Sequence, residues 1–122
     1  MSGSCFDGMS VLILKPEWLN AILFEGKRME IRGVSSQKIG HRIGLMASKT
    51  DHIAGVATIT ECVGPMTVEE FVSNESRHHC TTGKLPYEKT FGWALDDVSA
   101  LDTPVPHKPK QGAIIFSTYH SI

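Results

Sequence analysis

Three charged side chains, Lys27, Glu30 and Arg32, lie close together in the sequence and are the strongest candidates for a functional site. They belong to the stretch GKRMEIR (26–32), in which apolar and charged residues alternate. This alternation is typical of a strand that buries one face. Glu30 and Arg32 then share the other face, and Lys27 joins them if it still lies in the turn before the strand. The two cations suit contacts with a phosphate or a base edge, and Glu30 can accept from an exocyclic amine or act as a general base.

A second interpretation of the same residues requires no ligand. The charges are then a solvated face of a strand, on which a pair such as Glu30 and Arg32 contributes little stability. Composition alone favours this second interpretation.

A short predicted helix, residues 16–25, precedes the charged strand. Pro16 suits the first helical position, and Gly26 supplies the left-handed residue that commonly ends a helix. Trp18 and Ile22, with the apolar residues next to them, recur at helical spacing. Because this helix ends directly before the charged face of the strand, we expect that strand to form the floor of a cleft.

Apolar runs and turn signals predict the remaining elements. Thr67 and Glu70 form a possible capping box at the start of a second helix, residues 67–72. We expect a mobile loop at 33–41, an irregular polar stretch at 73–90, a turn of helix at 96–102 and an extended surface segment at 103–112. The other strands are predicted at 10–14, 42–47, 53–63, 91–95 and 113–118.

The chain of 122 residues has the size of one domain, with 41% hydrophobic and 20% charged residues. We expect residues 1–8 to be a flexible leader and residues 9–122 to form a small α+β domain, a partly closed β-barrel of about five or six strands flanked by two or three helices. The net charge of -1 by itself does not indicate a nucleic-acid-binding protein. Three widely spaced cysteines favour a reducing, cytoplasmic location, and no apolar run is long enough to span a membrane.

Three segments of the chain together resemble the ASCH domain of the PUA-like superfamily. They are the helix and charged strand of residues 15–32, the paired strands of residues 42–57, and the closing strands of residues 91–115. The resemblance implies a PUA-like barrel whose cleft is floored by residues 27–32, and it implies binding of RNA or of a modified nucleoside.

The resemblance also implies possible enzymes. One bacterial branch of the family removes the N4-acyl group of acetylated cytidine with a lysine, a threonine and a glutamate. Lys27 matches the lysine, Glu30 holds the threonine position, and Glu75 is the nearest glutamate in the loop. Because Glu30 is not a hydroxyl group, the chain departs from that chemistry. A weak ribonuclease activity is the other enzymatic possibility.

Aromatic and histidine side chains add candidates around the charged strand. Trp18 and Tyr87 suit stacking on a base, although the helical phase of Trp18 equally suits a core residue. Trp93, inside an apolar strand, is expected in the core. Adjacent His78 and His79 with one cysteine do not form a metal-ligand pattern, so no metal or cofactor is expected. His79 is preferred for an acid–base or stacking role because it lies closer to residues 84–89.

Ser48 and Lys49 follow a predicted strand and are candidates for a phosphate contact, although a plain polar turn explains them equally well.

The function that we expect from these residues is binding of single-stranded RNA or a modified nucleoside. The alternatives are hydrolysis of a modified cytidine through Lys27 and Glu30, and a protein-interaction module without cleft chemistry. The oligomeric state is left open. The expected cleft has the stretch 73–90 as its lid, and its lining is Trp18, Lys27, Glu30, Arg32, Ser48 and Lys49, with His79 and Tyr87 as further binding candidates.

Overall fold

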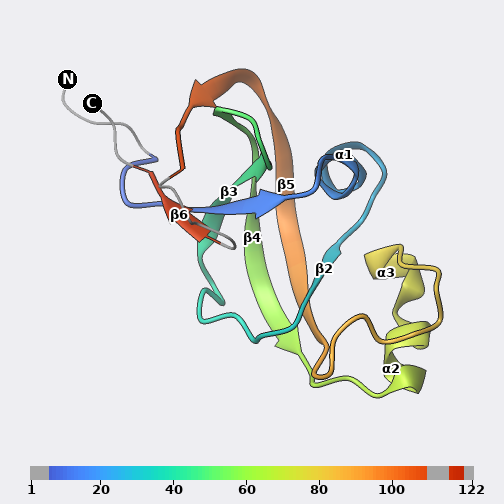
Figure 1. Cartoon of the computed structure of the whole chain (residues 1–122). Helices are drawn as coiled ribbons and strands as arrows, with labels where there is room; N and C mark the ends of the chain where they lie inside the picture. Colours follow the sequence, from blue (N-terminus) through green and yellow to red (C-terminus); the bar gives the residue numbers. More distant parts are fainter. Residues whose placement is uncertain (1–5, 110–115, 120–122) are drawn as a thin grey trace.

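The computed structural model describes residues 6–109 and 116–119 of the chain. In this part of the chain the strands form one six-stranded sheet, with helices packed beside it (Figure 1). The elements are β1 (Ser10–Leu14), α1 (Pro16–Phe24), β2 (Met29–Arg32), β3 (Arg42–Ala47), β4 (His52–Val63), α2 (Val68–Ser73), α3 (Glu75–His78), β5 (Phe91–Pro106) and β6 (Phe116–Thr118).

The sheet has the strand order β2-β5-β4-β3-β1-β6. β1 and β3 are parallel, and the other neighbouring strands are antiparallel. The long strands β4 and β5 change register three times, between Ile53 and Gly55, between Val56 and Thr58, and between Ile59 and Glu61. Such irregularities bend a strand and increase its twist. The result is the α+β, barrel-like sheet that the sequence predicts.

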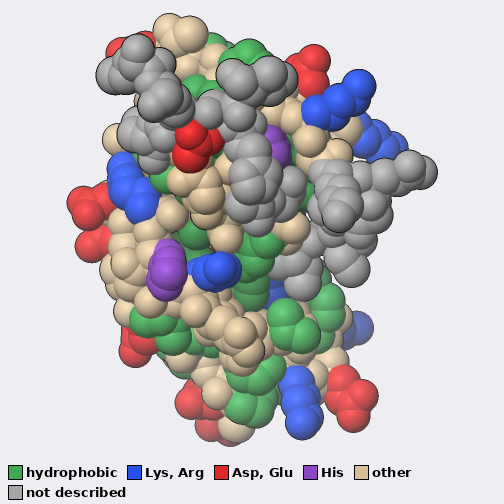
Figure 2. All heavy atoms as spheres, turned by 90° about the vertical axis from the view of Figure 1, so that its left-hand side faces the viewer, with side chains coloured by type: hydrophobic (Ala, Val, Ile, Leu, Met, Phe, Trp, Pro, Cys, Tyr) green, Lys and Arg blue, Asp and Glu red, His purple; other side chains and the backbone are tan. Residues whose placement is uncertain are grey.

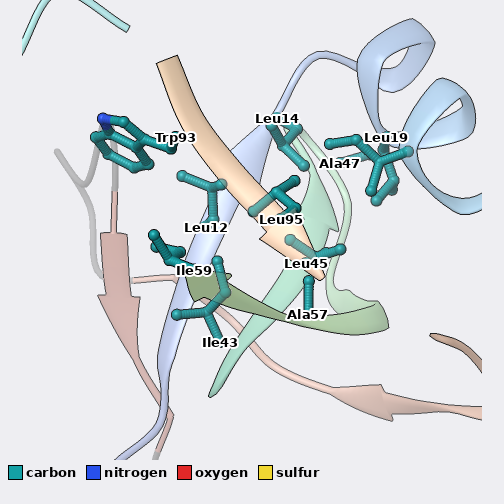
Figure 3. Packing of buried hydrophobic residues seen from close by; sticks show 11 residues of the cluster. Leu12, Leu14, Leu19, Ile43, Leu45, Ala47, Ala57, Ile59, Trp93 and Leu95 are labelled. Atoms are coloured by element: carbon teal, nitrogen blue, oxygen red, sulfur yellow. The ribbon is translucent and has the colours of Figure 1, made fainter. Parts of the chain in front are cut away.

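The main core lies inside the curve of the sheet (Figure 3). Leu12, Leu45, Ile59 and Trp93 are among its buried side chains, and α1 adds Leu19 to one side of it. A separate apolar cluster lies between β2 and α2, where Met29 and Ile31 pack in the same cluster as Phe71. β2 is therefore covered by apolar side chains on one face, which leaves the other face to Glu30 and Arg32.

The region after Leu95 differs from the sequence prediction. A turn of helix was expected at 96–102, but β5 continues through these residues to Pro106. The reason is tertiary: β4 is long enough to pair with this segment, and Val56 lies opposite Ser99 while Ile53 lies opposite Val105. The expected extended segment 103–112 is a strand up to Pro106, and residues 110–115 lie outside the described residues.

The stretch 73–90 was predicted to be irregular, and this is wrong for its first part, where α3 forms. Of the expected leader, residues 6–8 form a turn, and the Gly8 N–H donates to the Tyr119 carbonyl at 2.9 Å. The expected strand 113–118 is confirmed for β6, and residues 113–115 lie outside the described part. In the described residues, no helix combines the length and the hydropathy required to cross a membrane.

The predicted capping box of α2 is confirmed: the Thr67 hydroxyl accepts from Glu70 N, and the Glu70 carboxylate accepts from Thr67 N. Replacing Thr67 with alanine is expected to lower the free energy of unfolding by about 1 kcal/mol, because one backbone N–H loses its partner. Denaturant unfolding measures this loss. The exposed neighbour Glu69 is the control, and Glu69→Gln should change stability much less. Equal stability of the Thr67→Ala and Glu69→Gln proteins would contradict the prediction.

Candidate functional site

The lysine that precedes β2 is placed by the end of α1. Gly26 has φ 78°, a left-handed conformation that suits glycine, and the Lys27 N–H donates to the Ala21 carbonyl at 3.0 Å. Lys27 therefore lies in the turn and outside the strand. This frees its side chain from the strict alternation of β2 and lets it turn toward Glu30.

Lys27, Glu30 and Arg32 converge on one another, and we call them the charged triad. Arg32 Nε donates to Glu30 Oε2 at 2.9 Å, and Lys27 Nζ lies 3.9 Å from Glu30 Oε1. The three side chains are 1%, 5% and 15% exposed for Lys27, Glu30 and Arg32, respectively. The solvated charged face, which composition favoured, is therefore wrong, and the charges are buried together.

Arg32 connects the triad to the other side of the barrel. Its Nη2 donates to the Ile13 carbonyl at 2.9 Å, which links β2 to β1, two strands that are far apart in the sheet order. The guanidinium carbon lies 5.9 Å from the ring centroid of Trp93, whose indole N–H donates to the Val34 carbonyl at 3.0 Å. β2 and β1 are not paired as neighbouring strands, and the Arg32 side chain connects them instead. We call this place, where the triad lies, the seam between β2 and β1.

Lys27 connects the triad to the helices α3 and α1. Its Nζ donates to the His78 carbonyl at 2.5 Å and lies 4.4 Å from the centroid of the Trp18 ring. Trp18 is half-buried, so the indole forms part of the boundary between the lysine and solvent. Its contact with Lys27 is a cation–π contact, which is stronger where water is excluded.

Burial dominates the electrostatics of the triad. Desolvation lowers the pKa of Lys27 from its usual 10.5, and the nearby Glu30 carboxylate opposes this shift. Desolvation raises the pKa of Glu30 from its usual 4.5, and Arg32 and Lys27 oppose that shift. The pKa of Lys27 and the pKa of Glu30 therefore both move toward the range between their usual values.

The histidine next to the triad is His78, and not His79 as the sequence suggested. His78 is fully buried, and its ring stacks on Phe71 with centroids 4.1 Å apart. Its Nδ1 accepts from the Cys80 N–H at 2.9 Å, so the ring proton of the neutral form lies on Nε2, 2.6 Å from the Phe71 carbonyl. Sequence reasoning missed His78 because α3 was not predicted.

Two other predicted binding residues, Tyr87 and His79, lie next in sequence or in space to residues that adjoin the triad. Tyr87 is half-exposed and covers Gly33, where an added Cβ would be 3.0 Å from the Tyr87 ring, so it lies directly beyond Arg32. His79 is in the left-handed conformation at the end of α3, one residue after the carbonyl that holds Lys27. Both stay predictions for a binding surface.

Ser48 and Lys49 lie in the turn after β3. The Ser48 N–H donates to the Leu14 carbonyl at 2.7 Å, and Lys49 has φ 65°. Successive carbonyls of a strand point to opposite sides, so this turn is on the β3 side of β1, whereas Arg32 is bonded on the other side. Ser48 and Lys49 stay predictions for a phosphate contact.

The described residues contain no group of three or more His, Cys, Asp and Glu side chains that could hold a metal ion. On the face shown in Figure 2, the described lysines and arginines are scattered among acidic side chains and do not gather into one basic patch. With neither a metal-ligand group in the described residues nor a basic patch on this face, we consider the charged triad as the candidate for a ligand contact.

The fold is that of a known class of small α+β domains. An ASCH protein from Zymomonas mobilis superposes with a TM-score of 0.67 and 20% sequence identity, over 81% of this chain and 73% of that one. A serine-to-alanine variant from the same organism superposes with a TM-score of 0.71 and 18% identity, over 94% and 90%. A tyrosine-to-phenylalanine variant gives 0.67 and 20%, over 81% and 76%.

The chain therefore has the fold of an ASCH domain. No model of a known protein family matches the sequence, and no curated protein matches it. At identities of 18% to 20%, the likeness establishes the fold alone.

His78 is expected to make the folded protein less stable as the pH falls through 6.5. Burial lowers the pKa of His78 from its usual 6.5, so the unfolded chain takes up this proton at a higher pH than the folded chain does. Protonation at Nδ1 also removes the acceptor of the Cys80 N–H. Denaturant unfolding between about pH 7.5 and about pH 5 should show a smaller loss of stability for His78→Gln than for the wild type.

The raised pKa of Glu30 contributes with the opposite sign, so the prediction concerns the difference in pH dependence between the two proteins and not the wild type alone. The same pH dependence in the wild type and in His78→Gln would contradict the prediction.

Proposed function

We propose that this domain binds single-stranded RNA or a modified nucleoside at the charged triad. The observation that supports this most directly is the convergence of an ammonium, a carboxylate and a guanidinium at the seam between β2 and β1, beside a half-buried indole. Buried charges are costly unless they are paired, and they cluster at functional sites more often than elsewhere. The ASCH-like fold agrees with this assignment.

We assign the buried side chains of the triad to the floor of the proposed binding site, and the partly exposed side chains beside them to its rim. Lys27 and Glu30 are almost fully buried and form the floor. Arg32 and Trp18 are partly exposed and form the rim, which a nucleotide meets first. A base that stacks on the Trp18 ring replaces the water on its outer face, and Arg32 contributes donors for a base edge or a phosphate. Unstacked single strands present the base faces and edges that such a site requires.

RNA binding at the triad should depend only weakly on the salt concentration. With only one or two phosphate contacts near the rim, the slope of log K against log salt should be about -0.7 to -1.4 for a single strand. A fluorescence titration with a mixed single-stranded RNA pool, from about 50 to about 200 mM salt, measures it. Absence of binding at the lowest salt would overturn the proposal, and a much steeper slope would place the RNA on a broader surface.

A second function, hydrolysis of an acylated cytidine, is favoured by the raised pKa of Glu30 and by Lys27 Nζ, 3.9 Å from Glu30 Oε1. In this scheme the Glu30 carboxylate takes a proton from the attacking water and then delivers it to the leaving amine, while the Lys27 ammonium stabilises the negative charge on the acyl oxygen. Glu75 forms no ion pair with Lys27 in the described residues, so Glu30 is the acid–base partner in this scheme. Chromatography of a nucleoside panel that includes N4-acetylcytidine tests it. No turnover by the wild type, or full turnover by Glu30→Gln, would rule it out.

A further inference from the structure

Two consecutive carbonyl groups at the end of α3 hold the start of the charged strand. The Arg77 carbonyl accepts from the Arg28 N–H at 2.8 Å, and the His78 carbonyl accepts from Lys27 Nζ at 2.5 Å. The position of the Lys27 ammonium is therefore set by the backbone at residues 77 and 78, which is separated from it by about fifty residues of sequence.

The backbone at residue 78 is in turn fixed by the His78 ring. The ring bonds α2 through the Phe71 carbonyl at 2.6 Å, and it accepts from the Cys80 N–H at 2.9 Å on the other side. The ring also stacks on Phe71, and the side chain is fully buried. These contacts hold the His78 ring on both edges and on one face, and so restrain the backbone that carries the carbonyl.

We propose that His78 is the positioning residue of the charged triad, and that it holds its carbonyl oxygen against Lys27 so that the ammonium stays between Trp18 and Glu30. His78 does not touch the ligand in this account and acts only through Lys27. The inference concerns the geometry of the same site as the proposed function, and it rests on that function only for the role of the site in binding. The bond between Lys27 Nζ and the His78 carbonyl is already present in the ligand-free protein.

A bulky core residue is the simpler explanation of His78, and it makes a different prediction. If the ring only fills space next to Phe71, then phenylalanine at position 78 should serve equally well. If the ring positions the lysine, phenylalanine leaves the Phe71 carbonyl and the Cys80 N–H without partners. The segment 78–80 then moves, and water reaches Lys27. Because desolvation is the main reason for the lowered pKa of Lys27, hydration should raise it again.

The experiment measures the pKa of Lys27 in ligand-free protein, by NMR of lysine labelled at Cε, with the signal assigned from Lys27→Met. In the wild type the Lys27 pKa should lie below 10.5, and in His78→Phe it should rise by about one unit or more. His78→Asn is the conservative variant, because an asparagine oxygen can accept from the N–H two residues on. It should keep the Lys27 pKa closer to the wild-type value than His78→Phe does.

The matched control is His41→Asn, since His41 is an exposed histidine in front of β3. This variant should leave the Lys27 pKa unchanged. If His78→Phe does not fold, His78→Leu decides by the same measurement. A folded His78→Phe or His78→Leu protein with an unchanged Lys27 pKa overturns the positioning role. Because no RNA is present, this result is independent of whether the domain binds RNA, and failure of RNA binding alone would count only against the proposed function.

Discussion

Replacing Glu30 with alanine is expected to lower the free energy of unfolding by about 3–5 kcal/mol, which is the usual cost of breaking a buried ion pair. The carboxylate lies between two cations, 2.9 Å from Arg32 Nε and 3.9 Å from Lys27 Nζ. Without it, an ammonium and a guanidinium remain buried with no counter-charge and repel each other. Chemical denaturation at neutral pH measures the loss.

The control for this variant is Glu61→Ala, since Glu61 is an exposed glutamate on β4. It should change stability by no more than about 0.5 kcal/mol. Lys27→Met should cost less than Glu30→Ala, because it leaves the Glu30–Arg32 pair intact. The double variant Lys27→Met/Glu30→Ala should cost less than the sum of the two single changes. Equal denaturation curves for Glu30→Ala and Glu61→Ala would show that the triad is not electrostatically coupled.

Replacing Trp18 with alanine is expected to weaken binding of single-stranded RNA by roughly 5- to 150-fold. This range follows from the 1–3 kcal/mol that base stacking on an aromatic side chain supplies. The indole also shields Lys27 from solvent, with its centroid 4.4 Å from Nζ, so its removal exposes the floor of the site as well. Titration of the labelled RNA pool with each protein measures the change.

Phe24→Ala is the matched control for Trp18→Ala, because Phe24 belongs to the same helix and is 69% exposed. It should bind RNA with the wild-type affinity. Trp18→Phe keeps an aromatic face and should lose less affinity than Trp18→Ala. If Trp18→Ala and Phe24→Ala bind equally well, the indole does not stack on a base.

Local sequence signals predicted the elements whose stability is mainly local. The apolar run of β1, the alternation in β2 and the capping box of Thr67 each match the structure. The turn at Gly26 explains why Lys27 can join Glu30 and Arg32 although strict alternation would separate them. Trp93 could likewise be assigned to the core, because its neighbours in the sequence are apolar.

Features that depend on distant partners could not be predicted in this way. Asp96 and Asp97 suggest a turn, and Asp97 does have a left-handed φ of 48°, but it lies at an irregularity of the β4–β5 pairing, so the strand continues beyond it. The burial of the triad depends on Trp18 from α1 and on the His78 carbonyl from α3, and no local pattern announces either contact. Adjacent histidines give the same sequence signal, yet the fold buries His78 and leaves His79 half-exposed.

The position of the triad explains why its charges can be both structural and functional. Arg32 bonds β1 through the Ile13 carbonyl, and Lys27 bonds the end of α3 through the His78 carbonyl. Glu30 joins these two cations, so the triad connects the barrel to the helical segment. A ligand that competes for Arg32 or Lys27 would therefore act on the contact between these two parts of the domain.

The most direct test of RNA binding at the triad is an NMR titration of the protein with unlabelled single-stranded RNA at low salt. The chain has two tryptophans, so each indole N–H gives its own signal. We predict that the indole signal of Trp18 and the side-chain signal of Lys27 shift and saturate together, while the Trp93 indole, bonded to Val34, moves less. RNA binding that leaves the Trp18 and Lys27 signals unchanged, or no binding at all, would contradict the account.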